Sequence, residues 1–560
     1  MTAEARGVWS SQLQFILSCV GFSVGLGNLW RFPVTAYKNG GVAFLVPYII
    51  CSILVGLPVL YLELFIGQFT QSGPSKAFRN FMPALQGLGW AMSAVSFLTG
   101  IFYNMVVAWI LRYLFDIISL QSYKWTTCGN YWNTINCSSG ADGQQIRNAS
   151  TFAAEEFFRY RLLNYTDDIT QTGSFNWEIC FALLVAWTTT CLSIIKGVSV
   201  IGKISFLTAT LPYVIIVIMA VRGVTLDGSY EGIKYFLLRP DLSKILVFKT
   251  WLEATKQLCF SLGIGFGGLL SLSSFNKRSH NCFRDAIIVA TCDATMSVVG
   301  GIAVFSTLGY LSKSSGRKIE DLFSERGLTQ NVTNNGHGSI SFPAKHNELV
   351  VLGTCLLSFV IGLVMCWQSG YHWFNLLFES TGGQSVLMAC LLEVVVCVLV
   401  YGVTNLLRDI QECLGLPSGP CSRLFGASGL LVAGLPSGPC SRLFGASGLL
   451  MTGCWTVITP IILAVLLVFG FIDEAKILHQ SSTSGYWFDV PLRLTLEYSP
   501  LIAIPAFAII NVRYFINNDM LWKEVLRVQP KLPSYNRIQA KCKVHEEQRK
   551  PKSVWKADLL

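Results

Sequence analysis

Charged residues are scarce in this chain: Asp, Glu, Lys and Arg make up 13% of its 560 residues, whereas hydrophobic residues make up 52%. A soluble globular protein needs more charge to cover its surface. This composition, with a mean hydropathy of +0.50, therefore indicates a protein that crosses a membrane several times. Only six histidines occur and the 18 cysteines include no Cys-x-x-Cys pair, which argues against a structural metal site.

Further absences narrow the function. The chain has no glycine-rich phosphate loop and no recognisable nucleophile–base pair, so we expect no enzymatic activity. Its net charge of +10 is spread over short loops and the C-terminal tail, and because no separate basic face exists we expect no nucleic-acid partner. The polar first residues precede no short apolar core with a small-residue cleavage site, so we expect no removable signal peptide.

Long apolar runs are what the sequence has in place of charge. A helix needs about 20 apolar residues to cross the hydrocarbon core of a bilayer. We predict eleven such spans, at 12–33, 42–66, 86–115, 178–195, 203–222, 251–275, 285–311, 348–367, 372–402, 452–473 and 492–512.

The distribution of basic residues predicts the orientation of these spans. Short basic loops face the cytoplasm, and the basic residues here are Lys76, Arg79, Lys196, Lys203, Lys277, Arg278 and those of the tail after Arg513. The long polar insert 118–176 should then be extracellular. It carries three glycosylation sequons, at Asn136, Asn148 and Asn164, and two cysteines, Cys128 and Cys137, which an oxidising exterior permits to pair.

The first apolar run contains residues that a lipid-facing helix would not tolerate. Gly25, Gly27, Asn28, Arg31 and Pro33 all fall inside it. Freed backbone groups cost about 2–7 kcal/mol each away from water, so non-helical backbone persists at membrane depth only where it lines a cavity. We predict a helix broken at Gly25-Leu26-Gly27, with its backbone groups directed at a small ion and a small solute.

The sixth run repeats this pattern, because Phe260 to Gly268 places four glycines in the middle of an apolar segment. Two glycine-interrupted spans five apart indicate a binding site built between inverted repeats. Close glycine-mediated helix packing is the alternative for either segment alone.

Several motifs then identify a family. They are G-L-G-N-L-W-R-F-P at 25–33, N-G-G at 39–41, P-Y at 47–48, E-L-F-I-G-Q at 63–68, Y-N at 103–104, W-N-T-I-N-C at 132–137, S-L-G-I-G-F-G at 261–267 and Y-G-V-T-N-L-L-R-D-I at 401–410. Together they resemble the neurotransmitter:sodium symporter family. The resemblance implies an all-α polytopic membrane protein with a 5+5 inverted-repeat transporter fold and broken spans 1 and 6.

On this basis we divide the chain by its expected topology. The parts are a cytoplasmic N-terminus (1–11), spans 1–7 (12–311) with the extracellular loop 118–176, an atypical polar loop (312–347), spans 9–10 (348–402), a cytoplasmic loop (403–451), spans 11–12 (452–512) and a basic cytoplasmic tail (513–560).

The resemblance also implies roles for matching residues. The substrate site would comprise Gly25, Leu26, Gly27, Thr99, Tyr103, Phe260, Ser261, Gly263 and Phe266. One sodium ion would be bound by Ser23, Asn28, Ser261 and Asp293, and half of a second sodium site by Gly21 and Val24. Chloride ligands would map to Tyr48, Gln257, Ser261 and Ser297. Ordinary packing remains the alternative for Tyr103, Phe260 and Phe266.

Two substitutions bear on the substrate and the ions. Family members that carry biogenic amines have Asp at the position of Gly25, so glycine favours a substrate with its own carboxylate. Position 293, usually Asn, is Asp here, and an acid at this depth favours a functional role over a protonated structural one. We expect altered cation selectivity and weaker chloride dependence, as in invertebrate nutrient amino-acid transporters.

The gates are also carried over from the family. Arg31 would form the outer gate with Glu379, although direct alignment places Phe378 where the acid belongs. Arg6 and Trp9 match the inner-gate pair, with interface anchoring as an equal alternative.

The chain departs from its family in two places. Span 8 is missing, because the polar stretch 312–347 stands where that helix would lie. A lost exon, a splice form unable to transport or a re-entrant segment would each explain this, and we favour the first. A 17-residue segment also occurs twice, identically, at 415–431 and 434–450.

These observations predict a sodium-coupled symporter of neutral amino acids in the plasma membrane, with lipid as its surroundings. The alternatives are a transport-incompetent or mis-assembled sequence that at most binds amino acid, a GABA- or glycine-type transporter, and a channel. The preferred amino acid and the oligomeric state do not follow from the sequence.

Overall fold

A computed structural model gives the fold of the chain. It describes residues 8–25, 27–138, 151–166, 169–238, 241–315, 319, 347–414, 446–482, 489–518 and 525–526. Several predictions therefore fall outside the described residues: those on Arg6, Leu26 and Asn148, nearly all of the polar loop 312–347, the first repeat copy with most of the second, and most of the basic tail.

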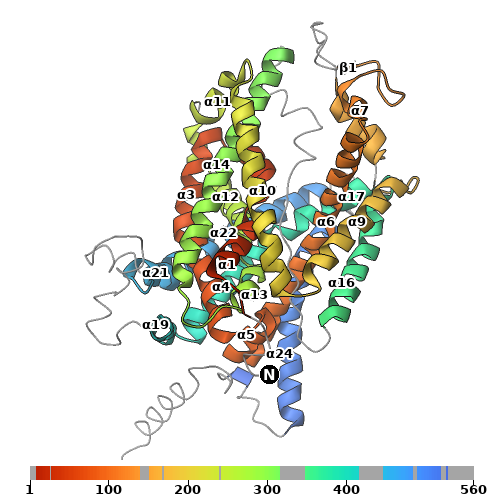
Figure 1. The fold of residues 1–560 in the computed structure, drawn as a ribbon. Helices are drawn as coiled ribbons and strands as arrows, with labels where there is room; N and C mark the ends of the chain where they lie inside the picture. Colours follow the sequence, from red (N-terminus) through yellow and green to blue (C-terminus); the bar gives the residue numbers. More distant parts are fainter. Residues whose placement is uncertain are drawn as a thin grey trace, which may run out of the picture.

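Helices make up nearly all of the described fold (Figure 1). Up to the polar loop they are α1 (Gln12–Ser23), η2 (Gly27–Arg31), α2 (Phe32–Lys38), η3 (Gly41–Phe44), α3 (Leu45–Cys51), η4 (Ser52–Gly56), α4 (Leu57–Thr70), α5 (Pro74–Phe81), η5 (Pro83–Leu85), α6 (Gln86–Ile118), α7 (Tyr123–Thr126), α8 (Ala153–Glu156), η6 (Phe157–Leu163), α9 (Trp177–Ile194), α10 (Val198–Val224), α11 (Ser229–Leu238), η7 (Leu242–Leu246), α12 (Phe248–Leu262), α13 (Gly268–Ser273) and α14 (Cys282–Ser315).

After the polar loop the helices continue. They are α16 (Asn347–Gly362), η8 (Leu363–Cys366), α17 (Gly370–Thr381), α18 (Gln384–Val395), η9 (Val396–Val400), α19 (Val403–Cys413), α21 (Leu449–Gly453), η11 (Cys454–Ile458), α22 (Thr459–Ser482), α23 (Asp489–Tyr498), η12 (Ser499–Ile502) and α24 (Ala503–Asn517). The described strands are one short parallel pair, β1 (Cys137–Ser138) with β2 (Thr151–Phe152).

Nine helical runs of the described chain are long and apolar enough to cross a membrane, and the bent pair Gln12–Ser23 and Gly27–Lys38 makes a tenth. The nine are Gly41–Thr70, Pro83–Ile118, Trp177–Ile194, Val200–Val224, Cys282–Ser314, Leu349–Cys366, Gly370–Val400, Leu449–His479 and Val490–Asn517. These nine runs and the bent pair together correspond to ten of the eleven predicted spans. The remaining span, 251–275, is divided into α12, of 15 residues, and α13, of six. The predicted all-α polytopic architecture is confirmed.

Both predicted helix breaks are present. α1 ends at Ser23, Val24 is extended, and the helix that resumes at Gly27 is bent by 48° from α1. Between α12 and α13, Gly263, Gly265 and Gly267 have φ of +69°, +83° and +73°. Side-chain-bearing residues rarely adopt this left-handed conformation, so the alternating glycines are what permits the break.

Two hydrophobic cores divide the helices. The larger core is formed mainly by α1, α4, α12, α14 and α18. The smaller core is formed by α6, α9, η8 and α17, and Figure 1 shows α9 and α16 on the opposite side of the molecule from α3 and α14. The broken segments of the first and sixth spans therefore pack in the larger core.

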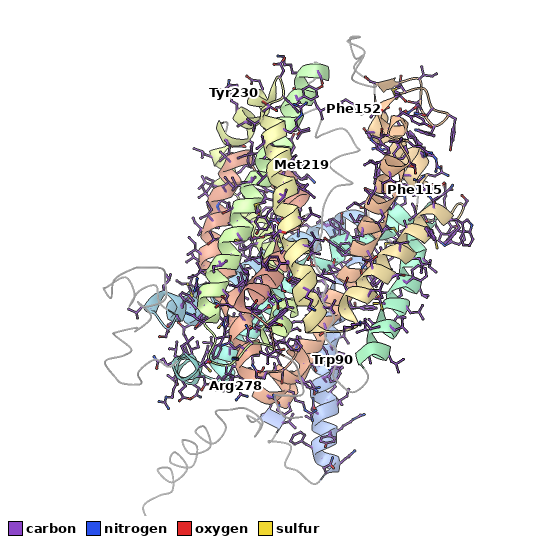
Figure 2. All side chains as sticks on the ribbon, viewed as in Figure 1. Trp90, Phe115, Phe152, Met219, Tyr230 and Arg278 are labelled. Carbon is purple, nitrogen blue, oxygen red and sulfur yellow. A yellow bond between two sulfur atoms is a disulfide. The ribbon has the colours of Figure 1, made fainter. Side chains whose placement is uncertain are left out.

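The outward faces of many helices are apolar, as expected of surfaces in contact with lipid. On α10, Phe206, Leu207, Met219 and Val221 are all exposed. Figure 2 marks Met219 on α10 and Phe115 on α6 among such side chains. A helix that is hydrophobic on every side is typical of a membrane span, because neither protein core nor lipid requires a polar face.

Candidate ion and substrate site

Asn28 is the centre of a buried polar cluster formed by the break of the first span. Its Nδ2 donates to Ser261 Oγ at 3.1 Å, to Asp293 Oδ1 at 2.8 Å and to Ser297 Oγ at 2.9 Å. A fourth acceptor, the backbone oxygen of Asp293, lies at 3.2 Å. These residues come from η2, α12 and α14, so three distant segments meet at one side chain.

Asp293 is the second centre of the cluster and is 1% exposed. Ser261 Oγ donates to its Oδ1 at 2.6 Å, and the Tyr48 hydroxyl donates to its Oδ2 at 3.2 Å. The hydroxyls of Tyr48 and Ser297 are 3.3 Å apart. The structure thus brings together residues that the family resemblance assigns to a sodium site and to a chloride site.

Gln257 adjoins this group on α12 and suggests that the cluster accommodates ions. Its side chain is fully buried, yet neither its amide nitrogen nor its amide oxygen has a hydrogen-bond partner among the described residues. Buried polar groups are normally satisfied. Carboxylate, hydroxyl and amide oxygens are the ligands that hard cations prefer, so this donor set fits a sodium ion.

The break of the first span is tied to the cluster by two further hydrogen bonds. Ser23 Oγ donates to the backbone oxygen of Leu262 at 3.2 Å, and the Gly25 backbone nitrogen donates to Asn28 Oδ1 at 3.0 Å. Gly27 is buried at the start of η2. Of the two residues predicted for the second sodium site, Val24 is buried within the break, whereas Gly21 packs against Ala209 of α10.

The apolar part of the predicted substrate site surrounds the second break. The Phe260 and Phe266 rings contact edge to face with their centroids 6.1 Å apart. Gly263 abuts the Phe22 ring, because a Cβ at this position would lie 2.3 Å from it. Thr99 and Tyr103 lie on α6, where Thr99 is buried and its hydroxyl donates to the backbone oxygen of Val95.

Two supporting residues were not among the predicted site residues. Ser96 Oγ on α6 donates to the backbone oxygen of Phe266 at 2.7 Å. Glu63, fully buried on α4, accepts a hydrogen bond from the Gly265 nitrogen at 2.5 Å, while Glu393 of α18 lies close to Glu63. An ionisable residue inside an apolar run is the signal that points to Glu63, whereas a serine on α6 carries no such signal.

The predicted outer-gate residues line a common cavity of about 600 Å³ but do not pair with each other in this conformation. Within the described residues, the ion pair of Glu379 is with Arg493, at 3.1 Å. The Arg31 guanidinium instead lies over the Phe260 ring, 4.3 Å from its centroid. Arg493 was not predicted, because a single basic residue at the start of the last span has no distinctive spacing.

At the opposite end of the first span, Trp9 anchors the chain that enters α1. Its indole nitrogen donates to the backbone oxygen of Leu272 on α13 at 3.0 Å, and its ring packs on Phe15. Trp9 therefore joins the start of the first broken span to the end of the sixth. This contact is consistent with either the gate or the anchor reading.

The insert 118–176 carries the predicted modifications. A disulfide joins Cys128 and Cys137, whose Cα atoms are 5.7 Å apart. Asn136 and Asn164 are exposed, as glycosylation requires, and their glycosylation stays a prediction.

The sequence of this chain is similar to those of proteins from one family. The model of the sodium:neurotransmitter symporter family matches residues 6–342 and 332–427. The sodium-dependent transporter snf-5 of Caenorhabditis elegans is 31% identical over 610 aligned residues, which cover 96% of this chain and 81% of the relative. Sodium- and chloride-dependent GABA transporter 2 is 29% identical in both rat and human, over 91% and 90% of this chain and 87% and 86% of the respective relatives.

The helical architecture, the two broken spans and these matches lead to one conclusion. Members of the matched family are transporters, not enzymes, and move small solutes across membranes together with sodium. This chain is a multi-pass membrane protein and belongs to the sodium:neurotransmitter symporter family.

Proposed function

We propose that the chain is a sodium-coupled symporter of neutral amino acids in the plasma membrane. The observation that carries the proposal is the buried cluster around Asn28, in which the break of the first span meets Ser261 and Asp293. A cluster of oxygens at a helix break holds a cation and leaves the adjacent backbone amides available for a carboxylate.

Gly25 supports an amino-acid substrate. It has no side chain, and its backbone nitrogen is fixed by Asn28 at the edge of the cluster. A substrate carboxylate can approach a helix N-terminus where an acidic side chain would repel it. The pair of phenylalanines, Phe260 and Phe266, provides an apolar surface for an uncharged substrate side chain.

Asp293 supports weak chloride dependence and tolerance of other cations. Its carboxylate supplies within the protein the negative charge that a bound chloride would otherwise provide. Tyr48 and Ser297, which the family resemblance assigns to chloride, hydrogen-bond to Asp293 or to each other. A carboxylate attracts any cation through its charge. It therefore strengthens cation binding without selecting strongly for one ionic radius.

The arrangement of the two cores suggests how transport proceeds. The broken spans belong to the larger core, and α6, which carries Thr99 and Tyr103, contributes to the smaller one. Rocking of spans 1, 2, 6 and 7 against the remaining helices would open the site to each side in turn. The basic loops and tail favour the cytoplasmic side for both termini. Eleven spans would place the two termini on opposite sides of the membrane, so this orientation requires that the functional protein has the missing span 8.

Uptake by the full chain in proteoliposomes tests the proposal. Labelled leucine, glycine and GABA are supplied with a sodium gradient or with choline in its place. We expect sodium-dependent accumulation of leucine. Ser261→Ala should reduce it, while Ser306→Ala, at a buried serine of α14 outside the cluster, should not. Leucine accumulation that is equal in choline would contradict the proposal.

Two other functions have specific support and separate outcomes in the same assay. GABA transport is favoured by the names of two relatives, and would appear as sodium-dependent GABA uptake that exceeds leucine uptake. A protein that only binds amino acid is favoured by the missing span 8 in the sequence. It would show saturable leucine binding without accumulation.

A further inference from the structure

The cavity beside Arg31 has an unusual charge. It is lined by elements of the outer-gate region, namely η2, α2, η7, α12, α17 and α23. Six basic side chains line it, Arg31, Lys38, Lys244, Lys249, Lys256 and Arg493, against two acidic ones, Glu253 and Glu379. The wall therefore carries four more positive than negative charges, since six minus two is four.

The two acidic residues are already used by neighbouring basic residues. Glu379 pairs with Arg493 at 3.1 Å, and Glu253 lies 3.9 Å from Lys256. No acidic partner within ion-pair distance is found for Lys244 or Lys249 in the described part of the chain. The cavity thus has a positive field that its own carboxylates do not neutralise. A concave, like-charged wall concentrates ions of opposite sign.

Arg31 gives an independent indication of a ligand. It is 8% exposed, and its Nη1 is buried without a hydrogen-bond partner among the residues described. A guanidinium group buried in this way normally donates to an acceptor, because an unsatisfied charged donor is costly. Its planar arrangement of donors matches a carboxylate or a phosphate better than a spherical ion.

None of the residues that form the cluster around Asn28 lines this cavity, and Phe260, which precedes Ser261 on α12, lies beside Arg31. The ring contacts the Arg31 guanidinium and also contacts Phe266. A ligand that meets Arg31 from the cavity therefore occupies a place different from that of a substrate beside Ser261. Lys244 and Lys249 lie near the start of α12, away from the residues that form the Asn28 cluster.

We propose that the cavity is a binding site for a small dicarboxylate anion, distinct from the substrate site. A volume of about 600 Å³ is far larger than a monovalent inorganic ion needs, and its basic residues lie on several separate elements. A dianion a few carbons long can meet Arg31 with one carboxylate and Lys244 or Lys249 with the other. The inference does not depend on which amino acid is transported.

Isothermal titration of the purified full chain in phosphatidylcholine nanodiscs tests the site, with succinate as the probe. We expect succinate to bind and its affinity to fall as salt is added, since ion screening weakens contacts in a partly open site. Lys244→Gln/Lys249→Gln should weaken binding by about tenfold, because the variant removes both lysines that can meet the second carboxylate and lowers the positive charge of the wall. The matched pair Lys76→Gln/Lys277→Gln, at exposed lysines outside the cavity, should change it less than about twofold.

The proposal would be overturned by no heat of binding with wild-type protein, by equal affinity in the Lys244→Gln/Lys249→Gln variant, or by equal affinity for succinamide, which has the same length but no charge. Equal affinity for sulfate at matched ionic strength would also overturn it, because any anion would then suffice. Sodium-dependent leucine uptake measured on the same preparations keeps the two proposals separate. A protein that binds succinate but does not take up leucine supports this site while contradicting the proposed transport function.

Discussion

Asp293 shows how one substitution can alter a site whose shape stays the same. Its carboxylate accepts hydrogen bonds from Asn28, Ser261 and Tyr48, and all four side chains are buried. Asparagine has the same outline but has no net charge. The difference between the two residues at this position is therefore chiefly one of electrostatics, and its effect should appear in ion dependence.

Asp293→Asn should make uptake depend more strongly on chloride. The variant loses the fixed negative charge beside the predicted cation site, and a bound chloride can restore it. We expect wild-type uptake to change little when gluconate replaces chloride, and the variant's uptake to fall by about tenfold or more, as one lost charge contact implies. Paired uptake assays measure this. The same chloride requirement in both proteins would contradict it.

Glu156, in the insert 118–176, has a role that can be tested by pH. Burial opposes its ionisation, but hydrogen bonds from Thr134, Thr151 and Asn133 outweigh that and lower the pKa of its carboxyl group. A lowered pKa stabilises the fold above the carboxyl's unfolded value of about 4.3. That stability is lost as the pH falls through the lower folded value.

Glu156→Gln should therefore make the insert more susceptible to proteolysis at neutral pH, and the difference from wild type should shrink as the pH falls below about 4. Limited proteolysis over a pH series measures this. Glu155→Gln, which alters a partly exposed pair with Arg159, is the control and should have little effect. An equal difference at every pH would count against the carboxylate's role.

Among the elements, the two helix breaks were the most predictable. Glycines inside apolar runs predicted both, because few other residues adopt the backbone that a break needs. The end of α12 at Leu262 and the start of α13 at Gly268 could not be predicted, since they depend on partners distant in sequence. Glu63 fixes Gly265 from α4, and Ser96 fixes Phe266 from α6.

Gly265→Ala should destabilise the second break. Gly265 has φ of +83°, and an added Cβ would lie 2.9 Å from both Cys390 and Val386. The left-handed conformation alone costs an alanine about 1–2 kcal/mol. Gly353→Ala on α16 is the matched control, since nothing lies within 4 Å of its added Cβ, and it should be neutral or stabilising. Thermal unfolding in detergent measures both variants, and equal melting temperatures would refute the expectation.

At the scale of the whole molecule, composition and span length predicted the architecture, and motif resemblance predicted which residues approach one another. Asn28, Ser261 and Asp293 lie far apart in sequence, yet meet as the family resemblance implies. The pairing of Glu379 with Arg493 and the basic cavity were not predicted. Charged residues on separate elements come together only through tertiary packing, so no local sequence pattern predicts the cavity.

Transport of a neutral solute with sodium should respond to membrane potential. Each positive charge moved gains about 2.3 kcal/mol per 100 mV, or about fiftyfold in the limiting accumulation ratio. Proteoliposomes with an imposed inside-negative potassium diffusion potential should accumulate leucine accordingly. Accumulation that is insensitive to voltage would show that no net charge accompanies the substrate.

The contacts of Asn28 have a consequence for biogenesis. Its partners Ser261 and Ser297 follow it by 233 and 269 residues, so the ribosome must complete most of seven spans before they exist. Until then the polar interruption of the first span resides in the membrane without its final neighbours. Assembly of this centre is therefore a late step of synthesis, and mutations in α14 should trap chains whose first span is inserted but immature.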